Sequence, residues 1–344
     1  FFLIIIIYFV PNRWIFASSY YLYFISLLML TLVIFIGKVG QGAERWLQIG
    51  PISVQPSEFV KLTTILAVAR FISKDEIDLN RVKDFFIASL FLVIPFLLII
   101  RQPDLGTSMV FAAFALPMFY WAGLRFNNLI LIIMPFLVIL ASFQFYSFLF
   151  LMIVFIAYLI FTQRSQLIII TNFLINIIMG LLTPVLWNHL KPYQRNRIKI
   201  FLNPESDPQG AGYQSGGISG KGFMEGSQTQ LRFLPEQHTD FIYGVIGEEF
   251  GFMGAIIGLL FFFTLLARGV KIAEIVKNKF NSIVAIGIVT VIAFHVTINI
   301  GMTVGILPVT GLPLPFVSYG GSSLLTNMAM IGLLLNFYKN RYEY

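Results

Sequence analysis

The sequence predicts an all-α fold: a polytopic integral membrane bundle of about ten transmembrane helices with one large extracytoplasmic loop. Three observations lead to this prediction. Of the 344 residues, 58% are hydrophobic and only 11% are charged, whereas a soluble domain carries about 25% charged residues. The mean hydropathy is +0.84. Apolar runs long enough to cross a bilayer recur along the whole chain without strand-like alternation, and such runs satisfy their backbone in lipid by forming helices.

The expected spans follow one another along the chain. Residues 1–10 are apolar but too short to cross a membrane, so we interpret them as the tail of a longer helix and expect the first span to be missing. Full spans are predicted at 18–37, 57–72, 83–101, 105–123, 127–143, 146–162, 166–189, 239–267, 280–305 and 318–337. The division between 127–143 and 146–162 depends on one polar break, Gln144 to Ser147.

The distribution of Lys and Arg predicts the orientation. The positive-inside rule puts the C-terminus, with Lys339 and Arg341, in the cytoplasm. The inside then also receives most basic residues of the short loops: Arg13, Arg70, Lys74, Arg81, Lys83, Arg125, Arg164, Arg268, Lys271, Lys277 and Lys279. The loop 190–238 falls outside. Its Gly and Pro residues, punctuated by apolar side chains, favour an ordered loop lying across the outer face.

The composition excludes several classes of protein. The chain has no cysteine, which excludes disulfides, thiolate catalysis and Cys-ligated metals. The net charge is +7, but the basic residues are spread through short loops, so nucleic-acid binding is not expected. The sequence contains no P-loop, Rossmann glycine pattern or metalloprotease motif.

Acidic residues enter an apolar run in LPEQHTDFIYGVIGEEFG, residues 234–251. Asp240 stands at the outer end of a predicted span, where it can cap the helix, act as a general base in an outward-facing cavity, or do both. Glu248 lies about 12 Å deeper. A charge at that depth costs about 2.5–3.5 kcal/mol, so it faces protein or water. Glu248 is therefore interpreted either as functional or as a packing device, protonated or paired with a basic side chain.

A second segment, ERWLQIGPISVQPSEFVK, covers residues 44–61. Pro56 and Ser57 mark a helix start, and Glu58 and Lys61 lie one turn apart, which suits an ion pair. A cap with a local salt bridge explains these residues. It leaves Arg45, on the same outer face, without a role.

Two further segments lie on the predicted outer side. RQPDLGTS, residues 101–108, forms a hairpin in which Asp104 can cap the next helix and Arg101 adds a positive charge. In residues 299–323, three prolines and five glycines interrupt an apolar region that includes Ser318. Interrupted helices often mark a binding site; the alternative is an ordinary Pro-rich connector. The apolar character favours a segment packed inside protein.

The predicted outer face is basic and carries a carboxylate. Arg and Lys bind phosphate oxygens. This combination at a membrane surface suggests a substrate that is anionic, lipid-linked and polyhydroxylated.

Five segments together resemble the SEDS family (shape, elongation, division, sporulation), which includes RodA and FtsW, with FLNPESDPQGAGYQ closer to the RodA type. They are RWLQIGPISVQPSEFVK, QPDLGTS, RNRIKIFLNPESDPQGAGYQ, GKGFMEGSQTQLRFLPEQHTDFIYGVIGEEFG and NIGMTVGILPVTGLPLPFVSYGGSS. The resemblance covers residue 41 to the end and implies a single SEDS-type transmembrane domain over 1–344.

The resemblance implies a bacterial peptidoglycan glycosyltransferase of the cytoplasmic (inner) membrane, serving cell elongation and shape. Such an enzyme polymerises lipid II into β-1,4 glycan strands, carried on undecaprenyl diphosphate, at the outer face, and works with a class B penicillin-binding protein as transpeptidase. The essential acidic residue of the family falls on Asp240. This chain departs from the family pattern in three places: the missing first span, an apparent insertion of two spans at 127–162, and a shorter run after Tyr213.

The chemistry that the resemblance implies needs one base. An α-linked donor and a β-linked product are related by a single inverting displacement, without a second carboxylate as nucleophile. Asp240 is the expected base. Candidate substrate-binding residues are Arg45, Glu58, Lys61, Arg101, Arg195, Arg197, Glu248 and Ser318. The sequence shows no dedicated metal site and requires no cofactor, although a divalent cation (Mg or Mn) bridging the diphosphate is compatible with it.

Two alternatives from other functional classes stay open. A lipid II flippase would also use deep acids, broken helices and a basic cavity, but its function would involve both faces. A non-enzymatic scaffold that recruits a penicillin-binding protein would not need Asp240.

Overall fold

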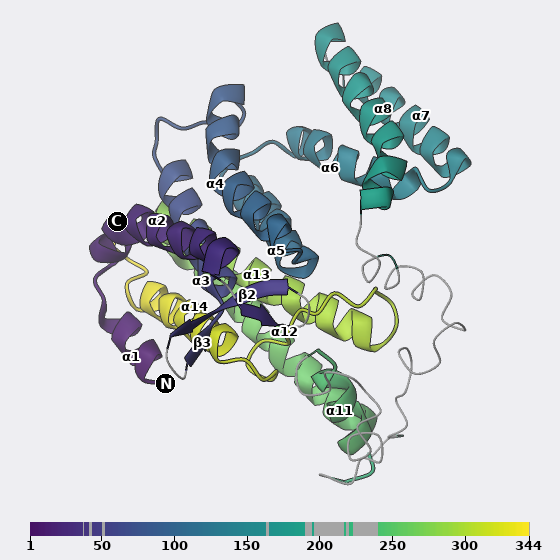
Figure 1. Ribbon diagram of the computed structural model, residues 1–344. Coiled ribbons are helices and arrows are strands. Elements are labelled where there is room, and N and C mark those ends of the chain that lie inside the picture. Colours follow the sequence, from purple (N-terminus) through teal and green to yellow (C-terminus); the bar gives the residue numbers. More distant parts are fainter. Residues whose placement is uncertain are drawn as a thin grey trace. The chain divides into compact units, whose positions relative to one another are not determined.

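The computed structural model describes residues 1–36, 38–40, 43–49, 52–162, 165–189, 195, 217, 220–222 and 240–343 (Figure 1). Its elements are α1 (Phe2–Phe9), α2 (Asn12–Ile36), β1 (Lys38–Gly40), β2 (Ala43–Ile49), β3 (Ile52–Val54), α3 (Pro56–Ile72), α4 (Val82–Arg101), α5 (Leu105–Trp121), α6 (Phe126–Ala141), α7 (Phe145–Phe161), α8 (Gln166–His189), α11 (Ile242–Glu249), α12 (Gly251–Ile275), α13 (Lys279–Thr303) and α14 (Gly321–Lys339). They group into two compact units, one of residues 1–123 with 200–344 and one of residues 124–199.

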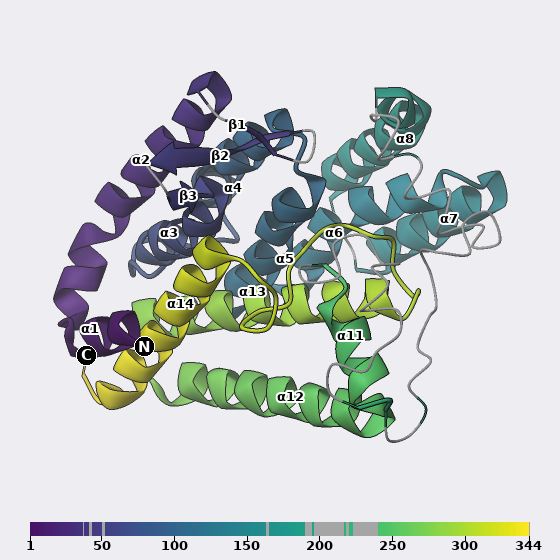
Figure 2. The ribbon, with the colours of Figure 1, turned by 60° about the horizontal axis from the view of Figure 1, so that its bottom comes forward.

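Helices α3 and α13 form the centre of the first unit. α3 contacts α2, α4, α5, α13 and α14, and most of its side chains are buried. α13 contacts α3, α5, α11, α12 and α14, and Figure 2 shows it running beside α12. Glu58 and Lys61 on α3 and His295 and Asn299 on α13 are therefore buried among protein side chains.

The outer helices expose large apolar side chains. On α12, Phe261 is 63% exposed and Phe263 is 67% exposed. A soluble protein rarely leaves such surface uncovered, and a bilayer covers it. Five described helices are long and apolar enough to cross a membrane, namely α2, α4, α8, α12 and α13, and α5, α6 and α7 are shorter apolar helices. The all-α membrane fold is confirmed in type, and the count of about ten spans stays a prediction.

The second unit consists of α6, α7 and α8. Its core contains Met134, Val138, Met152, Phe155 and Leu159. The predicted pair of helices at 127–143 and 146–162 is confirmed. The break between α6 and α7 lies at Ser142 to Gln144 rather than at Gln144 to Ser147, because α7 already begins at Phe145.

The last helix holds the end of the first. The side-chain amide of Asn336 on α14 lies 2.9 Å from the carbonyl oxygen of Ile7, 3.1 Å from that of Tyr8 and 2.7 Å from that of Val10. Asn336 is fully buried. It satisfies carbonyl groups that the C-terminus of a helix leaves without intrahelical partners.

A small antiparallel sheet lies between α2 and α3, in the order β1–β2–β3. Leu47 pairs with Val54 and Ile49 with Ile52. The all-α prediction did not include these strands, because a Gly-rich stretch of this length reads from sequence as a connector. Strand pairing gives the backbone N–H and C=O groups of the connector the hydrogen-bond partners that a helix would otherwise supply.

The predicted span 239–267 is not one helix. α11 ends at Glu249 and α12 begins at Gly251, whose φ is +64°. Glycine adopts this left-handed conformation without the penalty of a Cβ atom, so it permits the break. The other Pro- and Gly-rich segment, 304–320, separates α13 from α14 as predicted. Most of the loop 190–238 lies outside the described residues. The predicted ordered loop across the outer face therefore stays a prediction.

Candidate functional site

The 304–320 segment is fixed to α13 by two side chains. Asn299, which is fully buried, donates its amide hydrogens to the carbonyl oxygens of Leu312 (2.8 Å) and Asp240 (2.9 Å). One turn earlier on α13, His295 Nδ1 lies 3.1 Å from the carbonyl oxygen of Pro313. One face of α13 therefore holds both the Pro-rich segment and the residue just before α11.

A buried polar group joins α3 to this face. Lys61 Nζ lies 2.9 Å from Glu58 Oε1 and 3.1 Å from His295 Nε2. Lys61, Glu58 and His295 are only 1%, 4% and 3% exposed. We call these three residues the Glu58–Lys61–His295 group.

Hydrogen-bond logic assigns the histidine tautomer. A carbonyl oxygen only accepts, so His295 Nδ1 must donate to Pro313, and Nε2 of the neutral ring is then the acceptor for the Lys61 ammonium group. A continuous chain of polar contacts follows. It runs from the Glu58 carboxylate through Lys61 and His295 to the backbone of the 304–320 segment.

The predicted ion pair between Glu58 and Lys61 is confirmed. Lys61, however, lies inside the bundle, where two side chains already engage its ammonium group. Desolvating a buried ion pair costs several kcal/mol per charge, and hydrogen bonds must offset that cost. Direct contact of Lys61 or Glu58 with a substrate stays a prediction. The observed contacts favour an indirect role, in which the two residues support the protein around the site.

The segment RQPDLGTS packs on the same region. Asp104 Oδ1 accepts from the Thr107 backbone N–H (3.1 Å) and Oδ2 accepts from the Thr107 hydroxyl (2.9 Å), which confirms the predicted helix cap. A Cβ atom on Gly106 would lie 2.8 Å from the carbonyl oxygen of Thr310. Glycine thus allows the first turn of α5 to touch the 304–320 segment.

The start of α14 completes the framework. The Gln55 backbone N–H, just before α3, donates to Ser322 Oγ (3.0 Å). Ser318 Oγ accepts from the backbone N–H of Leu314 (2.7 Å), so it braces the turn before α14. This contact is to the protein itself, and substrate binding by Ser318 stays a prediction.

Glu248 is paired with a basic side chain. Its Oε1 lies 3.0 Å from Lys221 Nζ, and the two backbones also meet, with Lys221 N–H donating to the Glu248 carbonyl oxygen (3.0 Å). Gly222 N–H donates to the Glu249 carbonyl oxygen at the same distance. Of the two interpretations of Glu248, the paired packing device describes the observed contacts, and it fixes residues 220–222 to the end of α11.

The remaining predicted residues are scattered or undescribed. Asp240 is half-buried, and Arg101 is exposed at the end of α4. Arg45 lies on β2, but its side chain is outside the described residues, as is all of Arg197. Arg195 donates to the carbonyl oxygen of Asn188, in the other compact unit. Asp240 and Lys61, with its partner Glu58, therefore lie on one side of α13, and a site that these residues share with the arginines stays a prediction.

His295 and Asn299 were not among the predicted site residues. They stand four residues apart in FHVTIN, on one face of an otherwise apolar helix. Two hydrogen-bonding side chains on one face of a predicted span were a signal that could have identified them. Among the described residues, no three His, Asp or Glu side chains gather in a way that could hold a metal ion.

Comparisons with known proteins agree with this architecture. The FtsW/RodA/SpoVE family model, described as "Cell cycle protein", matches residues 1–148 and 133–343. The peptidoglycan glycosyltransferase MrdB of Escherichia coli K12 is 37% identical over 331 residues, which cover 93% of this chain and 78% of MrdB.

Two solved structures also match over 100% of this chain. One is a chain of a peptidoglycan synthase complex that coordinates polymerization and crosslinking, with a TM-score of 0.75, 29% identity and 87% of that chain covered. The other is RodA of Thermus thermophilus, with a TM-score of 0.66, 26% identity and 85% of that chain covered.

Proposed function

Because this chain belongs to the FtsW/RodA/SpoVE family of cell cycle proteins, we propose that it is a peptidoglycan glycosyltransferase of the inner membrane, in which Asp240 acts as the catalytic base. The predicted resemblance to the SEDS family is confirmed by the family match. The substrate that we propose is lipid II, and the product is a β-1,4 glycan strand for cell elongation and shape.

The proposed reaction is a single inverting displacement. Asp240 takes the proton of the acceptor 4-hydroxyl group while that oxygen attacks the anomeric carbon of the donor. The bond from the anomeric carbon to the diphosphate oxygen breaks, and undecaprenyl diphosphate leaves with the electron pair. A positioned base contributes about 10²–10⁴ in rate, and cations that stabilise the departing diphosphate supply a further part.

The observation that carries the proposal is the double hydrogen bond of Asn299. Because its amide holds the carbonyl groups of both Asp240 and Leu312, the backbone of the proposed base is fixed relative to the 304–320 segment. A base displaced by about 1 Å can lose about 10² in rate. This rigidity supports catalysis at Asp240. The alternative predicted for Asp240, capping of the following helix, describes it less well, because the N-cap residue of α11 is Phe241.

We assign Lys61 a positioning role rather than direct contact with the diphosphate. Its ammonium group is engaged by Glu58 and His295, and through His295 it holds Pro313. The leaving diphosphate is proposed to meet Arg101, with Arg45 as a further candidate; the roles predicted for Arg195 and Arg197 stay predictions. Arg offers a planar pair of donors for phosphate oxygens.

We propose that the site faces the outside of the cell and that the partner is a class B penicillin-binding protein. The orientation follows from the distribution of Lys and Arg. The similarity to a chain of a peptidoglycan synthase complex supports such a partner.

Polymerisation of purified lipid II tests the proposal. The wild-type chain, with a class B penicillin-binding protein added, should produce glycan strands, and Asp240→Asn should produce none while keeping its melting temperature. Transport of lipid II across vesicles without polymerisation would favour a flippase. Wild-type activity in Asp240→Asn would remove Asp240 as the base.

A further inference from the structure

A polar cavity lies at the end of the bundle away from the Glu58–Lys61–His295 group. It has a volume of about 800 Å³ and is formed where α1 meets α2, where α3 and α14 end and where α13 begins. Lys74, which lines the cavity, is thirteen residues after Lys61, and Lys279, which also lines it, is sixteen residues before His295. At 1.5 Å per residue the two sites are about 20 Å apart along these helices. In the predicted orientation this end faces the cytoplasm.

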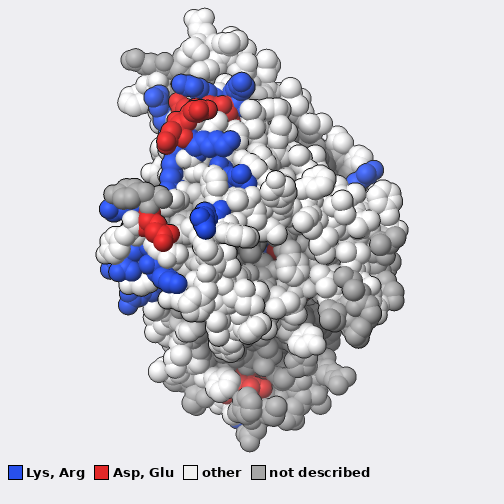
Figure 3. Space-filling view, turned by 90° about the vertical axis from the view of Figure 1, so that its left-hand side faces the viewer, with Lys and Arg blue, Asp and Glu red and all other residues white. Residues whose placement is uncertain are grey.

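The lining of this cavity is basic. It includes Arg13, Lys74, Lys279 and Lys339, and Glu343 is the one acidic residue among the described residues that line it. Figure 3 shows most of the visible Lys and Arg gathered along one edge of the molecule, with smaller groups of Asp and Glu between them, while the described residues of the rest of that face carry only a few charges. Within the described part of the chain, Arg13, Lys74 and Lys279 form no salt bridge. Their charges are available to an anion.

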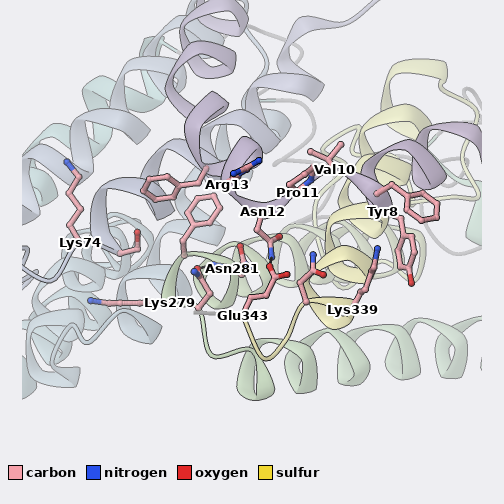
Figure 4. A pocket seen from close by; sticks show the side chains of 16 residues that line it. Tyr8, Val10, Pro11, Asn12, Arg13, Lys74, Lys279, Asn281, Lys339 and Glu343 are labelled. Atoms are coloured by element: carbon pink, nitrogen blue, oxygen red, sulfur yellow. Dashed lines mark hydrogen bonds between the residues drawn. The ribbon is translucent and has the colours of Figure 1, made fainter.

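Buried amide groups in the lining lack hydrogen-bond partners. Asn281, in the first turn of α13, is 0% exposed, and neither its Nδ2 nor its Oδ1 has a partner among the described residues. Asn12 Nδ2 donates to Glu343 Oε2 (3.0 Å), but Asn12 Oδ1 also has no partner there. An unsatisfied buried polar group costs about 1–3 kcal/mol. Figure 4 shows Asn12, Asn281 and Glu343 in the middle of the cavity, with Lys74 and Lys279 on one side and Lys339 on the other.

Helix ends add to the same preference. α2 and α13 both begin at the cavity, and the N-terminus of a helix favours a negative charge. α3 and α14 end there, and a helix C-terminus favours a cation; Lys74, just after α3, and Lys339, the last residue of α14, supply that positive charge. The ammonium group of Lys339 lies 4.8 Å from the ring centres of Tyr8 and Phe9. The cavity thus combines positive charge with apolar ring surface at its rim.

We propose that this cavity binds a phosphate ester that carries a free hydroxyl group. The phosphate accepts hydrogen bonds from the lysines, from Arg13 and from Asn281 Nδ2. The hydroxyl group donates to Asn281 Oδ1 or Asn12 Oδ1, which otherwise have no donor. Two sources share this chemistry: the glycerol phosphate headgroup of an anionic phospholipid, for which basic pockets on the cytoplasmic side of membrane proteins are suited, and a soluble glycerol phosphate. The proposal does not depend on the glycosyltransferase activity.

Binding to the purified full chain tests the proposal. The probes are dioleoyl phosphatidylglycerol, dioleoyl phosphatidylmethanol, which has the same charge without hydroxyl groups, dioleoyl phosphatidylcholine, and soluble glycerol 3-phosphate. Native mass spectrometry counts bound lipid, and the melting temperature reports stabilisation. We expect phosphatidylglycerol to stay bound and to raise the melting temperature. Phosphatidylmethanol should raise it less, and phosphatidylcholine should not raise it. Stabilisation by glycerol 3-phosphate with none by phosphatidylglycerol would identify the soluble source.

Variants locate the site. Each lysine near a lipid phosphate contributes about fivefold in affinity, so Lys74→Gln with Lys279→Gln should weaken phosphatidylglycerol binding about 25-fold. The matched control is Lys83→Gln with Lys271→Gln, two exposed lysines of the same predicted face that do not line the cavity. The control should keep its affinity within about twofold.

A neutral variant separates the amide from the charges. Asn281→Leu removes the unpartnered amide, so the ligand-free protein should melt at the same or a higher temperature while the shift induced by phosphatidylglycerol becomes smaller. If none of the anionic probes stabilises the wild type, or if the control pair loses as much affinity as Lys74→Gln with Lys279→Gln, the proposal is overturned.

Discussion

Replacing Lys61 by Met tests the buried Glu58–Lys61–His295 group directly. The substitution keeps the length of the side chain but leaves the Glu58 carboxylate, only 4% exposed, without its counter-ion. Breaking a buried pair by removing one partner costs about 3–5 kcal/mol. His295 Nε2 also loses its donor, which costs about 1–3 kcal/mol more if the nitrogen stays dry.

The double variant Glu58→Leu with Lys61→Met should recover most of this loss. Replacing a buried pair by apolar residues of similar volume is often neutral or stabilising, so only the cost at His295 should remain. The exposed pair of Arg81 and Asp78, also three residues apart and 4.0 Å between Nε and Oδ2, provides the control. Arg81→Met should change the stability by about 0–1 kcal/mol.

The assay is the melting temperature of each purified variant in one detergent, measured beside lipid II polymerisation. We expect the order wild type, Arg81→Met, double variant, Lys61→Met, from most to least stable. If Lys61→Met melts like the double variant, the Glu58 carboxylate is not held by Lys61 and the reasoning from the buried pair is refuted. Because Lys61 also supports Pro313 through His295, the double variant should regain stability without regaining full polymerisation.

Three further predictions concern the proposed active site and its orientation. Asp240→Asn should abolish polymerisation with an unchanged melting temperature, because Asn keeps the size and polarity of the side chain but is not a base; an active Asn variant contradicts the assignment. Gly106→Val should lower polymerisation and stability together, since its Cβ atom would press on the Thr310 carbonyl oxygen, whereas Ala122→Val, at the end of the same helix, should have little effect on either. A cysteine at Gln228, the only thiol in the chain, should react with an impermeant maleimide in intact spheroplasts; labelling only after lysis would reverse the orientation.

Several helices could be predicted from the sequence because each depends on a local pattern. Apolar runs of bilayer length define α4, α8 and α13 to within a few residues, and Pro56 marks the start of α3. The i to i+3 pair of Glu58 and Lys61 is local too, and it was predicted. These features need no knowledge of the rest of the chain.

The partners of those residues could not be predicted in the same way. His295 lies 234 positions from Lys61, and Asn299 lies 59 positions from Asp240. The way two helices pack decides which of their turns come into contact. The spacing of apolar residues along either helix does not specify that packing. The break at Gly251 and the strand pairing of β2 depend likewise on backbone hydrogen bonds to neighbours.

The hold of Asn336 on the end of α1 has a consequence for biosynthesis. The side chain and the three carbonyl groups are 326 to 329 positions apart in the chain. At about 5–20 residues per second, the ribosome makes Asn336 about 16–65 s after α1. During that interval the end of α1 must find other donors, such as interfacial water, the insertion machinery or a chaperone. A truncated chain that lacks α14 would keep the carbonyl groups at the end of α1 without the Asn336 amide, and membrane proteases could distinguish it from the complete protein by that exposed helix end.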